Sequence, residues 1–121
     1  IYHTNVMMAI GTSFVVICLE AVPDETEKQE LLQTFEATQK TVVEISFAQM
    51  EQFAGNMLQV ANQAGEGVLV MSQQAYESLS SDQIETLKAH SKLLYSPIET
   101  IEKYGGGSAR CMMAEVFKPI P

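Results

Sequence analysis

The chain is poor in positive charge. Seven Lys and Arg residues stand against 15 Asp and Glu residues, which gives a formal net charge of −8 at neutral pH. Proteins that bind nucleic acids neutralise phosphates with clustered Lys and Arg side chains. The composition therefore argues against nucleic acid as a partner. It assigns no acidic function, because a solvated acidic surface is the ordinary origin of such an excess.

Long hydrophobic runs are also missing. Residues 14–19 are apolar, but the run stops at Glu20, far short of the roughly 18 residues that cross a bilayer. Hydrophobic residues nevertheless make up 46% of the sequence and charged residues 18%, which predicts a packed core rather than disorder. We therefore expect a folded domain with no membrane partner.

Cysteine is scarce, and tryptophan is absent. The two cysteines, Cys18 and Cys111, lie far apart in unlike surroundings, which fits reduced thiols of a cytoplasmic protein better than a disulfide scaffold. Cys18 stands inside an apolar run and is predicted to belong to the core. No cluster of His, Cys and acidic residues has the spacing of metal ligands, so no metal or cofactor is expected.

The apolar pattern predicts strands and helices in alternation. Strands are expected at residues 6–10 and 14–22, around a turn at Gly11, and the next helix would begin after Asp24 as its N-cap. A strand at 41–45 and a short helix at 47–53 follow. The same order then returns, with strands at 56–60, 68–71 and 93–97, helices capped by Ser72 or Ser80, and a last helical segment at 98–101.

This return is an internal repeat. A shift of 51 residues takes Asn5 to Asn56, and a further 55 residues lead to Cys111, where a third unit would begin. The units cover about residues 1–54, 55–104 and 105–121, and each complete one reads ββαβ(α). Repeats of about fifty residues are typical of propellers, so the expected fold class is α/β (α+β), built from repeated units. On a common axis, His3 and Cys111 would start equivalent strands and meet.

A Cys–His pair of this kind could perform nucleophilic catalysis. The glycine triplet 105–107 precedes Cys111 and would let a ligand approach the backbone, while His3 could act as general acid and base. The alternative is structural. A lone cysteine is more often a packing residue, His90 would sit at a helix end, Met112 and Met113 would pack in a strand, and the acidic face of residues 25–36 would be solvated.

Three stretches resemble the arginine deiminase and amidinotransferase superfamily, the penteins, in its C-terminal half. YHTNVMMAIG is similar to the strand that begins with the catalytic His, FAGNMLQVANQAGEGVLVMS to the Gly-Asn hairpin, and GGGSARCMMAEVF to the Gly-rich segment that carries the catalytic Cys. They occur in the same order and span nearly the whole chain. Within the superfamily, the sequence looks most like bacterial amidinotransferase-type proteins related to arginine deiminase.

The resemblance implies a five-bladed α/β propeller and a role for each matching residue. Cys111 would attack the guanidinium carbon of an arginine-like substrate, and His3 would protonate the leaving amine and then activate water. A covalent thiouronium intermediate would be hydrolysed to a ureido product. The substrate-binding positions would be Gly106, Gly107, Ser108, Asn5 and Asn56. Asn5 occupies a position where arginine deiminases carry an acid.

The chain opens directly on a strand-like run, so we expect residues 1–121 to be the C-terminal part of a pentein catalytic domain. Its partners would be a small guanidino compound and the N-terminal half of the same protein, and exposed strand edges would favour self-association. Alone, these residues are expected to be inactive. Three alternatives stay open: an amidinotransferase, a non-catalytic repeat module that binds a ligand or partner, and a cysteine peptidase.

Overall fold

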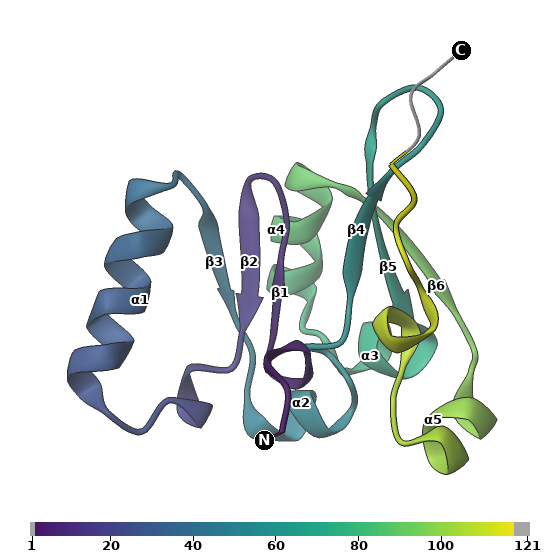
Figure 1. The fold of residues 1–121 in the computed structure, drawn as a ribbon, viewed down its shortest axis with the longest axis horizontal. Helices are drawn as coiled ribbons and strands as arrows, with labels where there is room; N and C mark the ends of the chain where they lie inside the picture. The colour runs from purple at the N-terminus through teal and green to yellow at the C-terminus, as the bar shows by residue number, and fades with distance from the viewer. Residues whose placement is uncertain (1, 118–121) are drawn as a thin grey trace.

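The computed structural model describes residues 2–117 as a mixed α+β fold with two small sheets. The first sheet has the order β1-β2-β3, and the second has the order β4-β5-β6. In each, the first two strands form an antiparallel hairpin and the third pairs parallel to the middle strand. Figure 1 shows the sheets side by side, with β1 next to β4. The strands are β1 (Met8–Ile10), β2 (Phe14–Ile17), β3 (Thr41–Glu44), β4 (Leu58–Ala61), β5 (Gly67–Ser72) and β6 (Lys92–Ser96). The repeat predicted from the sequence is therefore present in the strand order and pairing.

The helices begin where the sequence places side chains that cap them. Asp24, Ser72 and Ser80 each accept a hydrogen bond from a backbone N–H in the first turn of the helix that follows, as predicted. Within residues 2–117, no helix has both the length and the apolar character needed to cross a bilayer. The helices are α1 (Glu25–Ala37), α2 (Phe47–Glu51), α3 (Gln73–Ser78), α4 (Ser81–His90) and α5 (Glu99–Gly105), with 3-10 helices η1 (Thr4–Val6), η2 (Leu19–Ala21) and η3 (Ala109–Met112).

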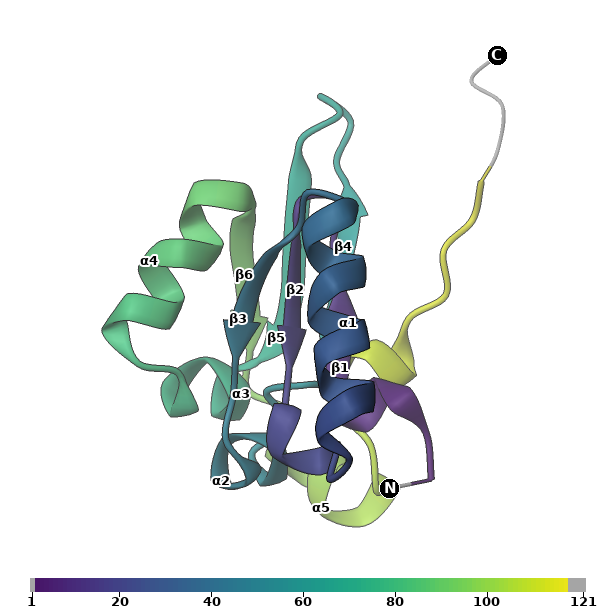
Figure 2. The ribbon, with the colours of Figure 1, turned by 90° about the vertical axis from the view of Figure 1, so that its left-hand side faces the viewer.

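One hydrophobic core joins the two units. Phe14, Val16 and Cys18 face Leu69 and Met71 across the interface, and all five side chains are essentially inaccessible to solvent. The alternate residues of β2 point the other way and pack against α1 through Phe35. Figure 2 shows α4 on one side of the strands and the segments η1 and η3 on the other. The prediction that Cys18 is a core residue is confirmed, because none of its surface is exposed.

Side-chain hydrogen bonds reinforce the contact between the units. Gln49 and Gln83 each close the capping box of their own helix and also bond to each other, with 2.6 Å between Gln49 Nε2 and Gln83 Oε1. His90, the last residue of α4, lies 2.7 Å from the hydroxyl of Ser13 in the first hairpin. The expected place of His90 at a helix end is correct, and the side chain also links the two units.

The structure corrects the predicted strand boundaries. The strand expected over residues 14–22 ends at Ile17, because Cys18 begins the turn of η2. The strands expected from residues 6 and 56 begin at Met8 and Leu58, after short turns. The prediction that Met112 packs in a strand is wrong: it closes the 3-10 helix η3, and the residue is 54% exposed. A chain segment coiled as a 3-10 helix forms no ladder with a neighbouring strand.

Candidate active site

Three turns with the same hydrogen bond start the successive units. The N–H of Val6 donates to His3 O at 3.1 Å, that of Asn56 to Phe53 O at 3.0 Å, and that of Cys111 to Ser108 O at 3.0 Å. Residues from all three turns line one cavity of about 190 Å³. The lining residues are Tyr2, His3, Asn5, Val6, Met50, Glu51, Phe53, Asn56, Gly106, Gly107 and Cys111. The repeat therefore brings His3 and Cys111 to one cavity from opposite ends of the chain.

Cys111 lies in η3, and its side chain is exposed to the cavity. Its sulfur is contacted on one side by the side-chain amide of Asn56, with 3.4 Å between Nδ2 and Sγ. On another side lies Gly107, where an added methyl group would stand only 3.0 Å from Cys111 Cβ and Sγ. An alanine at position 107 would therefore force the side chain of Cys111 to shift.

His3 stands at the N-cap of η1, and its side chain is exposed. The ring of Tyr2 meets it edge-on, with 4.9 Å between the ring centroids. The hydroxyl of Tyr2 in turn donates to the carbonyl oxygen of Gly106 at 3.4 Å. The imidazole is therefore bordered by an aromatic ring that reaches the glycine segment of the third turn, at the mouth of the cavity that holds Cys111.

The three glycines have different structural tasks. Gly105 is the last residue of α5. Gly106 follows as the C-cap with φ 72°, a left-handed conformation that glycine adopts without a steric penalty. Gly107 provides the space beside the sulfur of Cys111. The glycine-rich stretch thus ends one helix and lets the chain turn tightly against the thiol.

Of the predicted substrate-binding residues, Ser108 is the one that does not line the cavity. It is fully buried, and its hydroxyl donates to the carboxylate of Glu102 at 2.8 Å. Glu102 is itself 95% buried, on α5. Asn5, Asn56, Gly106 and Gly107 do line the cavity. Ser108 instead anchors the segment that leads to Cys111 onto the preceding helix.

Asn56 is the most buried polar residue of the cavity wall, with 3% of its surface exposed. Its Nδ2 donates to the backbone carbonyl oxygen of Asn5 at 2.9 Å as well as approaching the sulfur of Cys111. One side chain of the second turn therefore contacts both the first and the third turn.

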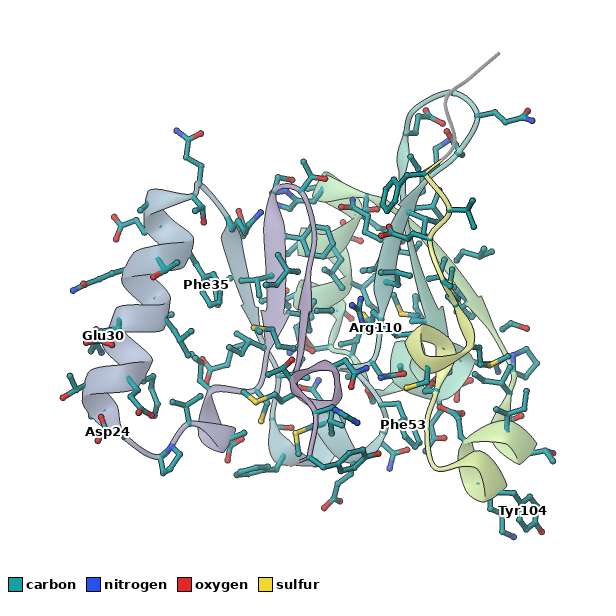
Figure 3. All side chains as sticks on the ribbon, in the orientation of Figure 1. Asp24, Glu30, Phe35, Phe53, Tyr104 and Arg110 are labelled. Atoms are coloured by element: carbon teal, nitrogen blue, oxygen red, sulfur yellow. The ribbon has the colours of Figure 1, made fainter. Side chains whose placement is uncertain are left out.

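The contribution of α2 to the cavity was not predicted from the sequence. Met50, Glu51 and Phe53 line the cavity from the end of that helix. Phe53 has φ 65°, a left-handed conformation that is rare for a bulky side chain, and its amide closes the helix by donating to Met50 O at 3.0 Å. Phe53 lines the same cavity as Asn5 of η1 and Cys111 of η3, and Figure 3 labels it below these two turns. The repeat contained a signal for this contribution: Met50, Glu51 and Phe53 precede Asn56 in the sequence, as His3 precedes the equivalent Asn5.

The two thiols are expected to react very differently with iodoacetamide. Burial raises the pKa of the Cys18 thiol, so less of it is thiolate at any given pH, and no surface admits a reagent. Cys111 is exposed. Within residues 1–121 of the native protein at pH 8, we expect one carbamidomethyl group, located at Cys111 by peptide mass spectrometry, and a second group only after unfolding in urea. The Cys111→Ser variant should take up none while folded; native labelling of Cys18 would contradict the buried placement.

The comparisons with known proteins show the family of the chain. No curated protein matches the chain, but the family model for eukaryotic N,N dimethylarginine dimethylhydrolases matches residues 1–118. This family is part of the pentein superfamily, so the superfamily expected from the three motifs is confirmed. The expected likeness to bacterial amidinotransferase-type proteins stays a prediction. The chain belongs to the N,N dimethylarginine dimethylhydrolase family.

Proposed function

We propose that Cys111 and His3 hydrolyse a guanidino substrate to a ureido product. The observation that carries the proposal is that these two residues, from different repeat units, line one small cavity with the thiol exposed. The family supports guanidino-group hydrolysis in general. A nucleophile and a proton-transferring group at one cavity are what a covalent hydrolysis of this kind requires.

The reaction would proceed in two steps. The sulfur of Cys111 forms a bond to the guanidinium carbon, and the C–N bond to the departing amine breaks as His3 gives it a proton. The resulting thiouronium is then attacked by water, one proton of which passes to His3. The C–S bond breaks to release the urea and the Cys111 thiolate, and the second proton of the water goes to the departed amine, which leaves as an ammonium ion. His3 thus returns to its starting state. Dividing one difficult substitution into two steps is the usual benefit of covalent catalysis.

Among residues 2–117, Glu51 supplies the single carboxylate in the cavity lining. A guanidinium ion is planar and pairs with a carboxylate through two parallel N–H donors. We propose that Glu51 faces the cationic end of the substrate, and that the ring of Phe53 adds an aromatic surface for it. Asn5, together with the backbone of Gly106 and Gly107, would complete the binding site.

The two repeat units would be blades of a closed five-bladed propeller, as part of a larger catalytic domain. Two apolar surfaces support this. A cavity of about 490 Å³ between β1 and α1 is lined largely by Met7, Met8, Ile17 and Leu31, and the far face of the second sheet carries the exposed Leu94. Adjacent blades would cover both. Residues 1–121 alone would then lack part of the substrate site and form no ureido product.

The test uses the full-length protein with N,N-dimethylarginine, the substrate named by the family. The expected products are citrulline and dimethylamine, with one oxygen of the citrulline taken from ¹⁸O-labelled water, and rapid acid quenching should trap an adduct on the peptide that contains Cys111. Transfer of the amidino group to an added amine in place of water would make the protein an amidinotransferase. A folded protein that yields neither product from any guanidino compound would be a non-catalytic module, contrary to the proposal.

A further inference from the structure

We propose that Asn56 is a positioning residue for the nucleophile: its side-chain amide holds the sulfur of Cys111 and stabilises it as thiolate. The inference deepens the proposed function, since it takes Cys111 as the nucleophile. Asn56 would act on the sulfur and not on the substrate.

The orientation of the Asn56 amide follows from its neighbours. The carbonyl oxygen of Asn5 can only accept, and it lies 2.9 Å from Nδ2, so the NH₂ group must face it. The second proton of the same nitrogen is then free for the sulfur of Cys111 at 3.4 Å. Turning the amide over would place its oxygen against the carbonyl oxygen of Asn5, which is repulsive.

The arrangement leaves the side-chain oxygen of Asn56 without a hydrogen bond, which costs free energy of folding. Within residues 2–117, Oδ1 of Asn56 is buried and accepts no hydrogen bond. A buried acceptor without a partner costs about 1–3 kcal/mol, so such groups are uncommon unless the rest of the side chain has a task. Here both donors of Nδ2 are used, one to fix the first turn and one on the sulfur. The donor pair explains why an amide occupies this buried position.

The contact also has a chemical consequence. An N–H donor stabilises an anionic acceptor more strongly than a neutral one, so the bond favours thiolate over thiol. Gly107 lies on another side, where an added methyl group would stand only 3.0 Å from the sulfur. The Asn56 amide and the missing side chain at position 107 together define where the sulfur lies. The hydrogen bond from Asn56 to Asn5 O fixes the first turn, which carries His3, relative to the sulfur of Cys111.

The test is the pH dependence of Cys111 alkylation by iodoacetamide in the full-length protein. Asn56→Ala should move the profile toward higher pH and make alkylation about tenfold slower near neutral pH. Asn56→Asp, which keeps the size but places an acceptor against the sulfur, should move it further. The matched control is Asn62→Ala in the β4–β5 hairpin, which loses side-chain hydrogen bonds far from the thiol and should leave the profile in place.

A second measurement needs no change at Asn56. In NMR spectra of the unmodified protein, the side-chain NH₂ signals of Asn56 should shift over the pH range in which Cys111 alkylation accelerates. The same signals should not shift in Cys111→Ser. The inference would be overturned if the folded Asn56 variants had the alkylation profile of the unmodified protein. It would also be overturned if the NH₂ signals of Asn56 behaved identically with and without the thiol of Cys111. Because neither readout uses a substrate, a moved profile in a protein without turnover would retain the role of Asn56 and refute the proposed function instead.

Discussion

Alanine at Cys111 is expected to reduce formation of the ureido product by at least about 10⁴-fold in the full-length protein, because the bond that starts the reaction can no longer form. The thiol lies on the surface of η3 and contributes little to the core, so the same variant should unfold at an unchanged urea concentration. Citrulline formation should therefore be lost, while the urea unfolding curve measured by circular dichroism stays unchanged.

His3→Ala should lower turnover by a smaller factor, about 10²–10⁴, since the covalent step survives while proton transfer is lost. This difference gives a sharp comparison. An isothiourea substrate releases a thiolate of low basicity, which needs little protonation. It should therefore restore much of the rate of the first step in His3→Ala, measured as thiol released in the first turnover, and none in Cys111→Ala. The double variant should be no slower than Cys111→Ala, because the two residues act in one sequence of steps.

Equal rescue of both variants by the isothiourea would contradict the assignment of roles. So would residual turnover of Cys111→Ala within tenfold of the unmodified protein, because another group would then be the nucleophile. A conservative control is Cys18→Ala, which removes the other thiol from the core. It should lower stability through the lost packing but leave the alkylation of Cys111 unchanged.

The repeat and the elements were predictable because they rest on local patterns. Apolar periodicity predicted the strands. The short polar side chains of Asp24, Ser72 and Ser80, which act as N-caps, predicted where helices begin. The meeting of His3 and Cys111 at one cavity followed from the repeat itself. A pattern that recurs in sequence places equivalent residues at equivalent points of each unit.

Features of the site that depend on packing between units could not be predicted. The sequence indicated a strand at Cys111, whereas the segment turns as η3 because Ser108 is drawn onto Glu102 of α5. From the sequence, Ser108 is predicted to be a polar residue next to the thiol. Its complete burial depends on the tertiary structure and could not be predicted. The left-handed backbone of Phe53 had no signal either, because glycine is the residue expected there.

A methyl group at Gly55 is expected to separate the first two turns and disable the site. The added Cβ would stand 2.4 Å from the carbonyl oxygen of Val6 and 2.9 Å from the carbonyl carbon of Met7. Both are backbone atoms, so no side chain can rotate away, and the two turns themselves must move apart. Overpacking of this kind costs about 3 kcal/mol of the free energy of unfolding.

The same close approach allows Asn56 to reach the carbonyl oxygen of Asn5, so Gly55→Ala should break that bond and lower turnover by more than about tenfold even where the protein still folds. Urea unfolding and citrulline formation measure the two effects. The matched control is Gly105→Ala at the end of α5, where the added Cβ would meet only Ile101 Cγ2 at an ordinary 3.7 Å. Since alanine favours a helix over glycine by about 0.5–1 kcal/mol, this variant should be as stable as the parent or more so. Equal behaviour of the two alanine variants would mean that the contact between the first two turns does not hold the site together.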